Sequence, residues 1–531
     1  MLSYRKLAMC VLGRPLHTGG GIDSPRPASQ RAAAFILTAA MLTTLAAPAF
    51  AKTWHIEDGD ITVKAGTTGN DVTQNNKTTY GDKDTVITNQ NKDIASSNTV
   101  TIDAGNDKVE VTLDNVNIKT DSGSALTSKG DVTLTLKGDN SFTGGISGNS
   151  SYDLSGITSS GSLTISGGTV TATGGDSTDS DGSGGIGIHS GSLTITGSTV
   201  NATGGNGSND RSSSGGSGIH IFGNGSLTVS DGTVTATGGN GGTGDASDGG
   251  SGISGSGSSG KGSLTVSGGT VNATGGSSGN GDFSDGGSGI NISDVTVSGG
   301  TVTATGGNGG TGDYSDGGSG IYSNSGGVTI SGGTVTAAGG SSGNGINSYG
   351  GSGIHSVSGS ITISGGTVEA AGGSSGSSNG GSGIYSSVID LSGSLELTAK
   401  AGKGTRSNGK ALSQKGSELD LDAIKEKLGP GAKVTATDAN GETKEVSIPG
   451  SVEPKPPVTP VEPEGPVIPE ESSSSSDGGS AAPSAPASPL PGLTVTDKDG
   501  QRISYTSTQS GNTLTVCVGR LTASFRISLA A

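Results

Sequence analysis

Cysteine is scarce in this 531-residue chain, and proline is missing from most of its length. The two cysteines, Cys10 and Cys517, lie near opposite ends, so a disulfide framework is not expected. No proline occurs between Pro48 and Pro430, as expected where nearly every backbone N–H belongs to a strand ladder. Only 28% of the residues are apolar, a low fraction that would also suit a disordered chain. The spacing of these apolar residues therefore decides the fold class.

Basic residues are also few, with 30 Lys and Arg against 46 Asp and Glu and a formal charge of −16. Residues 1–51 hold five basic residues and one acid, so the remainder carries −20. Such an acidic chain argues against nucleic acid as a partner. The sequence also contains no HExxH or P-loop motif, and no GxSxG elbow of the hydrolase type, since GxSxG occurs only within the Gly/Ser loops, at 275–279, 339–343, 372–376 and 376–380.

One pattern is repeated seven times between residues 161 and 402: a GSLTIS-like run, then GGTVTATGG, a loose Gly/Ser/Asp loop, and GSGI. The valine of each TV dipeptide marks the phase, and successive valines are 30 to 37 residues apart. A constant motif with a variable gap indicates a solenoid whose length changes fall in a single loop. These valines are Val170, Val200, Val234, Val271, Val302, Val335 and Val368.

Each repeat has the side-chain alternation of three short strands. In TVTAT, Val170 and Ala172 share one face while the threonines share the other, and Leu163, Ile165 and Ile188 add inward positions. An α-helix is excluded because each glycine would cost it about 1 kcal/mol. Stacked repeats would bury continuous apolar columns, and parallel crossovers are nearly always right-handed. The sequence therefore predicts an all-β, right-handed parallel β-helix, with coils about 4.8 Å apart.

The segment before the repeats is predicted to contain a signal peptide and irregular coils. In residues 1–51, a basic stretch precedes the apolar run AAAFILTAAMLTTLAA, and Ala49-Phe50-Ala51 suits signal peptidase. A membrane anchor is the alternative, but the run is short. Residues 52–156 alternate apolar and polar positions less regularly and are predicted to form the first coils, ahead of the regular repeats of residues 157–402.

The segment after the repeats changes character three times. Residues 403–450 are predicted to cap the last coil with a helix over Leu419–Gly429 and a hairpin over 433–448 that turns at Asn440-Gly441. Residues 451–491 contain 11 of the 17 prolines and a five-serine run, which predicts a disordered linker. Residues 492–531 would form three or four strands of a small β module, either truncated or paired with another partner.

The order TVTID, VEVTLDNVNI, SALTSKGDVTLTLKGDNSF and then SGGTVTATGG resembles secreted bacterial carbohydrate-binding domain-containing β-helix proteins. The resemblance covers residues 54 to 400. It implies a pectate-lyase-like, right-handed parallel β-helix that binds acidic plant polysaccharide or cellulose with the help of calcium and does not cleave it. The β-helix lyases need a basic residue beside calcium, whereas residues 157–402 contain only Arg211, Lys261 and Lys400 as basic residues.

Acidic residues recur in the loops, three of which share the form GD-x-SDGGSGI. If these loops stack in register, carboxylates come to lie about 5 Å apart and repel one another by about 1 kcal/mol even in water. A calcium ion, which takes oxygen ligands, would relieve this repulsion. The alternative is a set of solvated, mobile loops. The candidate calcium ligands are Asp245, Asp248, Asp282, Asp285, Asp313 and Asp316.

The residue after each GSGI isoleucine is predicted to face outward. Three of the four histidines that follow residue 51 fall at this position. A column of flat, hydrogen-bonding side chains could lie beneath a polysaccharide, since sugar rings pack on aromatic rings. The alternative is the ordinary preference of tyrosine for exposed strands. The candidate carbohydrate-binding residues are His189, His220, Asn291, Tyr322, His355 and Tyr385, with Ser254 in the same register.

These observations predict an exported protein, secreted or held at the cell surface, that binds a pectic or cellulosic polysaccharide without cleaving it. Contacts repeated along one column would raise the avidity for a long chain. No membrane span is expected after residue 51, and the oligomeric state stays open. An adhesin or a structural spacer is the alternative function. A polysaccharide lyase or hydrolase is the less favoured one, because carboxylates distant in sequence could still converge.

Overall fold

The computed structural model describes residues 52–146, 154–178, 182–209, 212–257 and 260–450, and four strand backbones nearer the C-terminus. The chain divides into two compact units, Met1–Glu453 and Pro454–Ala531. The predicted signal peptide (1–51) and linker (451–491) lie outside the described residues. In the second unit, β32 (Leu493–Asp497) pairs with β35 (Phe525–Leu529), and β33 (Tyr505–Ser510) pairs with β34 (Thr513–Val518), both antiparallel.

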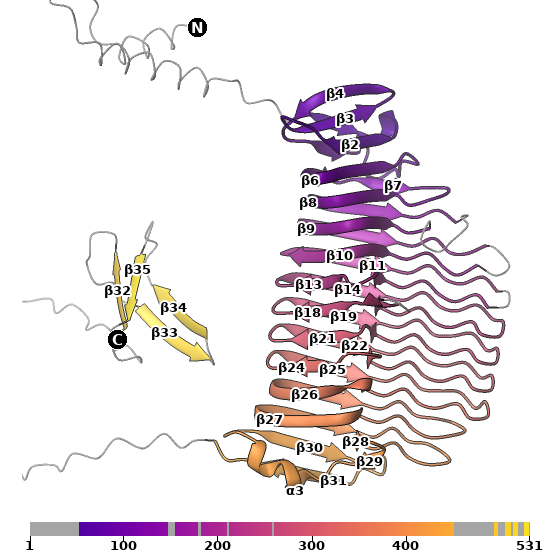
Figure 1. Ribbon diagram of the computed structural model, residues 1–531, viewed down its shortest axis with the longest axis vertical. Coiled ribbons are helices and arrows are strands. Elements are labelled where there is room, and N and C mark those ends of the chain that lie inside the picture. Colours follow the sequence, from indigo (N-terminus) through magenta and orange to yellow (C-terminus); the bar gives the residue numbers. More distant parts are fainter. Residues whose placement is uncertain are drawn as a thin grey trace, which may run out of the picture. The chain divides into compact units, whose positions relative to one another are not determined.

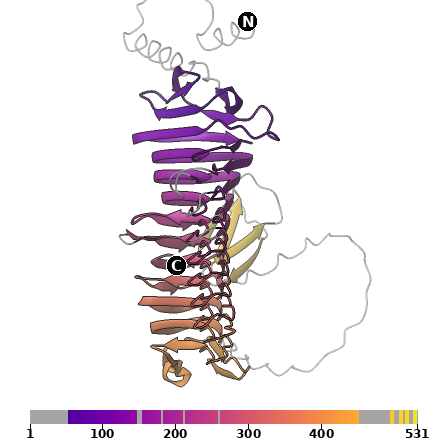
Figure 2. The same cartoon turned by 90° about the vertical axis from the view of Figure 1, so that its right-hand side faces the viewer.

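The first unit is a β-solenoid of about 11 stacked parallel turns (Figures 1 and 2). The prediction of a parallel β-helix is therefore confirmed. At several turns the chain runs through its corners without a break, giving long strands: β6 (Val100–Asp114), β8 (Leu126–Thr143), β9 (Ile157–Thr173), β10 (Ile188–Thr196), β26 (Ile354–Ala371) and β27 (Ile384–Lys400).

Elsewhere each turn consists of three short strands that stack in three sheets. The first sheet contains β12 (Ile219–Ile221), β15 (Ile253–Ser254), β20 (Ile290–Asn291), β23 (Ile321–Ser323) and β28 (Leu412–Gln414). The second contains β13 (Ser226–Val229), β18 (Ser263–Val266), β21 (Asp294–Val297) and β24 (Val328–Ile330). The third contains β11 (Ser198–Thr203), β14 (Gly232–Thr237), β19 (Thr270–Thr274), β22 (Thr301–Thr305), β25 (Thr334–Ala338) and β30 (Lys433–Thr437). A two-residue pair, β16 (Ser256–Gly257) and β17 (Gly260–Lys261), is antiparallel.

The core is made of apolar columns that run the length of the stack. All seven phase-marking valines pair in register with one another, from Val170 to Val368. Each is at most 1% exposed. A second column places Ile290, Ile321 and Ile354 in register, all fully buried. Burial of apolar surface stabilises a fold by about 25 cal/mol per Å², so these columns hold the described turns together without a crosslink.

The N-terminal end of the stack is closed by an antiparallel meander rather than by another coil. The meander consists of three antiparallel strands, β2 (Ile61–Ala65), β3 (Asn70–Gln74) and β4 (Lys77–Asp82). Strand β2 also pairs in parallel with β6 of the first coil. The sequence interpretation of residues 52–156 as coils alone missed this meander. The remaining elements here are β1 (Thr53–His55), η1 (Ile56–Asp58), β5 (Val86–Thr88) and β7 (Asn117–Lys119).

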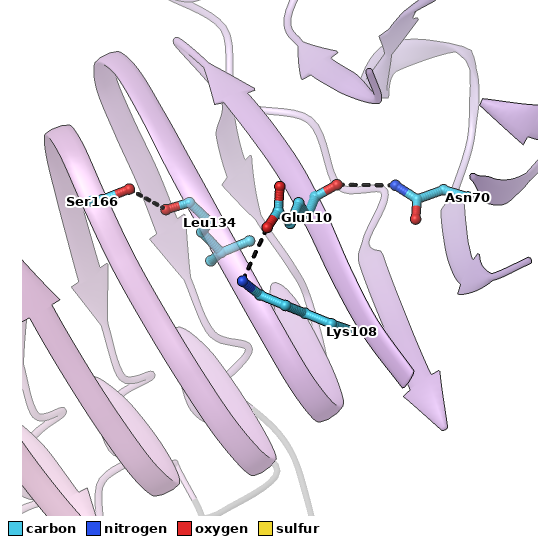
Figure 3. A network of polar contacts seen from close by, with 5 residues as sticks. All are labelled: Asn70, Lys108, Glu110, Leu134 and Ser166. Carbon is cyan, nitrogen blue, oxygen red and sulfur yellow. Dashed lines mark hydrogen bonds and ion pairs between the residues drawn. The ribbon is translucent and has the colours of Figure 1, made fainter. Parts of the chain in front are cut away.

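Asn70, only 8% exposed, ties the meander to the first coil. Its side-chain amide donates to Thr85 Oγ1 at 3.0 Å and to the carbonyl oxygen of Glu110 at 2.9 Å. Figure 3 shows the second of these bonds, together with the ion pair between Lys108 and Glu110 on the same strand and the longer contact from Ser166 to Leu134 between neighbouring coils. An asparagine here satisfies a carbonyl at the edge of a sheet that would otherwise be open.

The C-terminal cap is close to the prediction. Strand β30 forms an antiparallel hairpin with β31 (Thr443–Ser447), which confirms the predicted hairpin. The helix is shorter than predicted: α3 (Leu421–Ile424) is followed by the 3₁₀ turn η2 (Lys425–Lys427). Asp420 caps it by accepting from the Asp422 N–H at 3.0 Å. A short strand, β29 (Ser417–Glu418), pairs with β28.

Candidate functional site

The described residues of the loops between the third and first sheets are hydrogen-bonded from one loop to the next, which differs from the loose loops that the sequence suggested. Each loop has an outgoing and a returning limb, here called the glycine limbs, and Figure 1 shows them projecting together from one side of the strands. In the loop of residues 275–289, the Gly287 N–H donates to the Gly276 carbonyl across the two limbs at 2.9 Å. Gly307 of the next loop donates to Gly287 at 2.7 Å. This alternation repeats along the stack.

Only glycine fits these positions. A Cβ atom added to Gly307 would lie 1.9 Å from the carbonyl oxygen of Gly276, and one added to Gly287 would lie 2.0 Å from that of Gly250. Neighbouring limbs approach so closely that any side chain would displace backbone. The double glycines of each repeat are therefore required by packing, and this packing fixes the limbs as walls.

At the tips of three loops the GD-x-SD motif forms a turn that bonds to the turn of the next loop. The residue at x adopts the left-handed backbone region, with φ values of 54°, 57° and 58° at Ala246, Phe283 and Tyr314. The serine after it is fully buried: the Ser284 N–H donates to Ser315 Oγ at 3.1 Å. The recurrence of the motif at a constant place thus reflects bonding between turns.

The six predicted calcium ligands form two separate columns. The outer aspartate column is Asp245, Asp282 and Asp313, and the groove aspartate column is Asp248, Asp285 and Asp316. In both, one carboxylate oxygen accepts a backbone N–H of the next loop, at 2.7 to 3.1 Å. Within the described residues, no three or more His, Cys, Asp or Glu side chains are grouped so that they could hold a metal ion. Calcium binding stays a prediction.

The six predicted carbohydrate-binding residues fall into one column, with Ser254 between them, as their register predicts. The strand partners run from His189 to His220, Ser254, Asn291, Tyr322, His355 and Tyr385. Their rings touch: Tyr322 and His355 meet edge to face at 5.2 Å between ring centroids, and His355 and Tyr385 at 4.8 Å. We call Asn291, Tyr322, His355 and Tyr385 the ring column.

The ring column and the groove aspartate column both line a groove of about 740 Å³, and we call them its two walls. The Gly-Gly-Ser segments that join the two walls along the chain also line the groove, and we call them its floor. In each turn the residue at the groove-aspartate position precedes the ring-column residue by six positions. We call such a pair of residues a rung. Successive rungs are Asp285 with Asn291, Asp316 with Tyr322, Tyr349 with His355, and Asn379 with Tyr385.

The sequence interpretation missed two residues of this groove, Tyr349 and Asn379, both of which line it. The available signal was their constant position, six residues before a ring-column residue. Conversely, His189 and His220 are in the predicted column but do not line the groove. They stack on each other at 5.2 Å, and His189 also stacks on Phe222 at 4.8 Å. The outer aspartate column does not line the groove either.

The groove aspartates carry an electrostatic cost. Burial in the groove raises the pKa of Asp285 to about 6, and the charges of Asp316 and Asp248 add to the rise, against a lowering by the Asp316 N–H bond. Burial likewise raises the pKa values of Asp248 and Asp316. On the other wall, burial lowers the pKa of His355, which favours neutral imidazole. Asp285 nevertheless stays exposed to solvent, so the cost in stability is small.

The two walls differ in what they offer a ligand. The aspartates supply hydrogen-bond acceptors, the serines of the floor supply hydroxyls, and the other wall supplies phenol and imidazole rings. A long ligand that has hydroxyl groups at its edges and apolar faces would meet both walls at once. The groove crosses several turns, so its shape favours an extended polymer over a compact metabolite.

None of the described helices has the length and apolar character needed to cross a membrane. The comparisons with known proteins add no relative: no family model, no curated protein and no solved structure matches this chain.

Proposed function

We propose that this chain is an exported carbohydrate-binding protein that holds an extended polysaccharide along the groove and does not cleave it. The observation that carries the proposal is a single groove, crossing successive rungs, that is lined by the rings of Tyr322, His355 and Tyr385 and by the groove aspartate column. Sugar rings pack their apolar faces on aromatic rings. Their hydroxyl groups donate to carboxylates, which are acceptors when ionised.

Repetition is the source of affinity in this proposal. A single rung offers two side chains, as the carboxylate of Asp316 and the ring of Tyr322 do, a contact comparable to one weak subsite. The groove presents at least four such rungs in register, and a chain bound at one rung reaches the next at high effective concentration. The resemblance to secreted carbohydrate-binding β-helix proteins supports the same function and supports a location outside the cell or at its surface.

Calcium enters the proposal through charge. The groove aspartates would repel the carboxylates of a pectic polysaccharide, so binding of such a polymer requires a cation between them. Calcium, with its preference for carboxylate oxygens, is the cation that the resemblance implies. A cellulosic chain is neutral and needs no such bridge.

An adhesin or structural spacer is the second candidate. The observation that favours it is the closure of both ends of the solenoid, by the β2–β4 meander and by α3 with the β30–β31 hairpin. A rigid rod with closed ends would hold another domain away from a surface. A spacer has no need of tyrosine and histidine lining a groove together with carboxylates, so the groove favours binding.

The test removes two rings from the groove. In the double variant Tyr322→Ala and Tyr385→Ala, retention on the bound polysaccharide should fall at least about tenfold, because two rungs lose their stacking surface. Binding is measured by affinity electrophoresis against pectin, cellulose and host glycans, each with calcium and with a chelator. Tyr80→Ala is the matched control, since Tyr80 is 78% exposed and does not line the groove. Unchanged retention of the double variant, or no retention of the wild type by any polymer, would favour the spacer.

A further inference from the structure

The groove is not uniform along its length. One end is walled by the three groove aspartates, whereas the other end is walled by Tyr349 and Asn379 and contains Lys410. Rings of the other wall begin at Tyr322 and continue to Tyr385. The groove therefore has an acidic half and an aromatic half, which overlap at the rung of Asp316 and Tyr322.

The charge of the acidic half is not balanced by the protein. In the described part of the chain, Asp248, Asp285 and Asp316 form no ion pair, whereas the four ion pairs there are Lys108–Glu110, Lys400–Glu369, Lys427–Asp390 and Lys433–Glu445. The groove aspartates also repel one another: burial raises the pKa of Asp285 most, and the charges of Asp316 and Asp248 raise it further. A positively charged ligand would offset this repulsion, and its binding would be favoured by the attraction to the carboxylates.

We propose that the ligand of this groove is a polysaccharide of amino sugars with free, protonated amino groups. This inference rests on the proposed function and names its substrate class. Ammonium groups on successive sugars would pair with the groove aspartates. The sugar rings themselves would pack on Tyr322, His355 and Tyr385, where tyrosine faces also attract cations.

An ammonium group suits this geometry better than a bare metal ion. Each groove aspartate already gives one oxygen to a backbone N–H, and the three carboxylates follow one another in single file, one per turn. Calcium takes 6–8 oxygen ligands around one centre, whereas an ammonium group has three N–H donors and bonds readily to one carboxylate at a time. A repeating polymer of singly charged units therefore matches a repeating column of single carboxylates.

The experiment compares three hexasaccharides of β-1,4-linked sugars by titration calorimetry with the full chain at pH 6.5. They are the glucosamine hexamer, its fully N-acetylated form and the glucose hexamer. The glucosamine hexamer should bind at least about tenfold more tightly than the other two, and its advantage should shrink as NaCl is raised, because salt screens exposed charge pairs.

Two triple variants locate the effect. Asp248→Asn, Asp285→Asn and Asp316→Asn together should abolish the preference for the glucosamine hexamer, while the amide oxygens keep the backbone bonds. The control is Asp245→Asn, Asp282→Asn and Asp313→Asn, which removes the same charge and keeps the same type of bond outside the groove. It should retain the preference.

The outcomes separate this inference from the proposed function. Equal or tighter binding of a neutral hexamer, or binding only of a uronate polymer with calcium, would overturn the amino-sugar inference and leave polysaccharide binding standing. No binding of any sugar would overturn both. Equal loss in the two triple variants would also overturn the inference, because the effect would then come from overall charge rather than from the groove.

Discussion

The strands and the glycine limbs of this solenoid share one repeat but are stabilised in opposite ways. The strands bury columns of valine and isoleucine, so their stability comes from the size of side chains. The limbs contain almost no apolar side chains and approach until carbonyl oxygens would lie about 2 Å from any added Cβ, so their stability depends on side chains being absent. Stacking in register thus depends on large buried side chains in the strands and on the absence of side chains in the glycine limbs.

This difference assigns separate tasks to the two regions. The strands set the spacing of the turns and present the ring column from Asn291 to Tyr385. The limbs hold the groove aspartate column, the other wall of the groove, at a position that bonded backbone fixes. Neither region alone makes the groove. A substitution in the strands should displace the groove aspartate column, and one in the limbs the ring column, only if the turns lose their register.

The largest expected effect is the addition of one carbon to a limb. In Gly307→Ala the new methyl group would lie 1.9 Å from the Gly276 oxygen, so backbone must move and the bonds from Gly307 to Gly287 and from Gly287 to Gly276 are lost. We expect a loss of about 3 kcal/mol or more. Hydrogen exchange should show lost protection in residues 275–289 and 306–320, with the strands still protected. Gly450→Ala is the control, since no atom lies within 4 Å of its added Cβ. Full protection of the limbs in Gly307→Ala would contradict the comparison.

A smaller effect is expected for removing two carbons from the strands. Val302 lies five residues before Gly307 in the same turn and is fully buried between Val271 and Val335. Val302→Ala should cost about 2 kcal/mol through lost burial and a small cavity, measured by denaturant unfolding. Exchange should rise evenly over β19, β22 and β25, because a cavity weakens the column without moving backbone. If Val302→Ala were more damaging than Gly307→Ala, the limbs would be the softer region.

The strands could be predicted from the sequence because their signal is local. Alternation within TVTAT gives the face of Val302, and the repeat spacing places that valine beside Val271 and Val335. Each step uses residues that are adjacent in sequence or one repeat apart. The ring column followed from the same reasoning, since Tyr322 directly succeeds a core isoleucine.

The limbs and the full groove could not be predicted in this way. A segment rich in glycine and serine has the same composition whether it is a flexible linker or an interlocked limb. The bond from Gly307 to Gly287 joins limbs that run in opposite directions. Nothing in one repeat reveals that pairing. The sequence likewise groups Asp282 with Asp285 as candidate calcium ligands, whereas only Asp285 of the two lines the groove. Tyr349 and Asn379 were missed because neither is an acid, although both stand where the earlier repeats have the last aspartate of GD-x-SD.

The smallest expected effect separates bonding from charge in the limbs. In Asp285→Asn the side chain can still accept the Asp316 N–H, but the carboxylate is gone. The pKa of Asp285 is raised to about 6 in the folded chain, so between pH 4 and pH 6 the folded state holds more protons than the unfolded state. The stability associated with the protonated group is present below pH 4 and is lost as the pH rises through 6. The variant avoids that loss.

Asp285→Asn should therefore raise the melting temperature at pH 8 by about 2 °C or less, with the difference vanishing near pH 4. Asp313→Asn is the matched control, because it removes a charge from the outer aspartate column and retains the same type of backbone bond. Paired melting curves from pH 4 to 8 distinguish the two explanations of the limb contacts. A variant that melts lower than the wild type at pH 8, but equally near pH 4, would mean that the charge itself strengthens the bond to Asp316. The stability of the limbs would then depend on ionised aspartates, and the close approach of glycine backbones alone would not account for it.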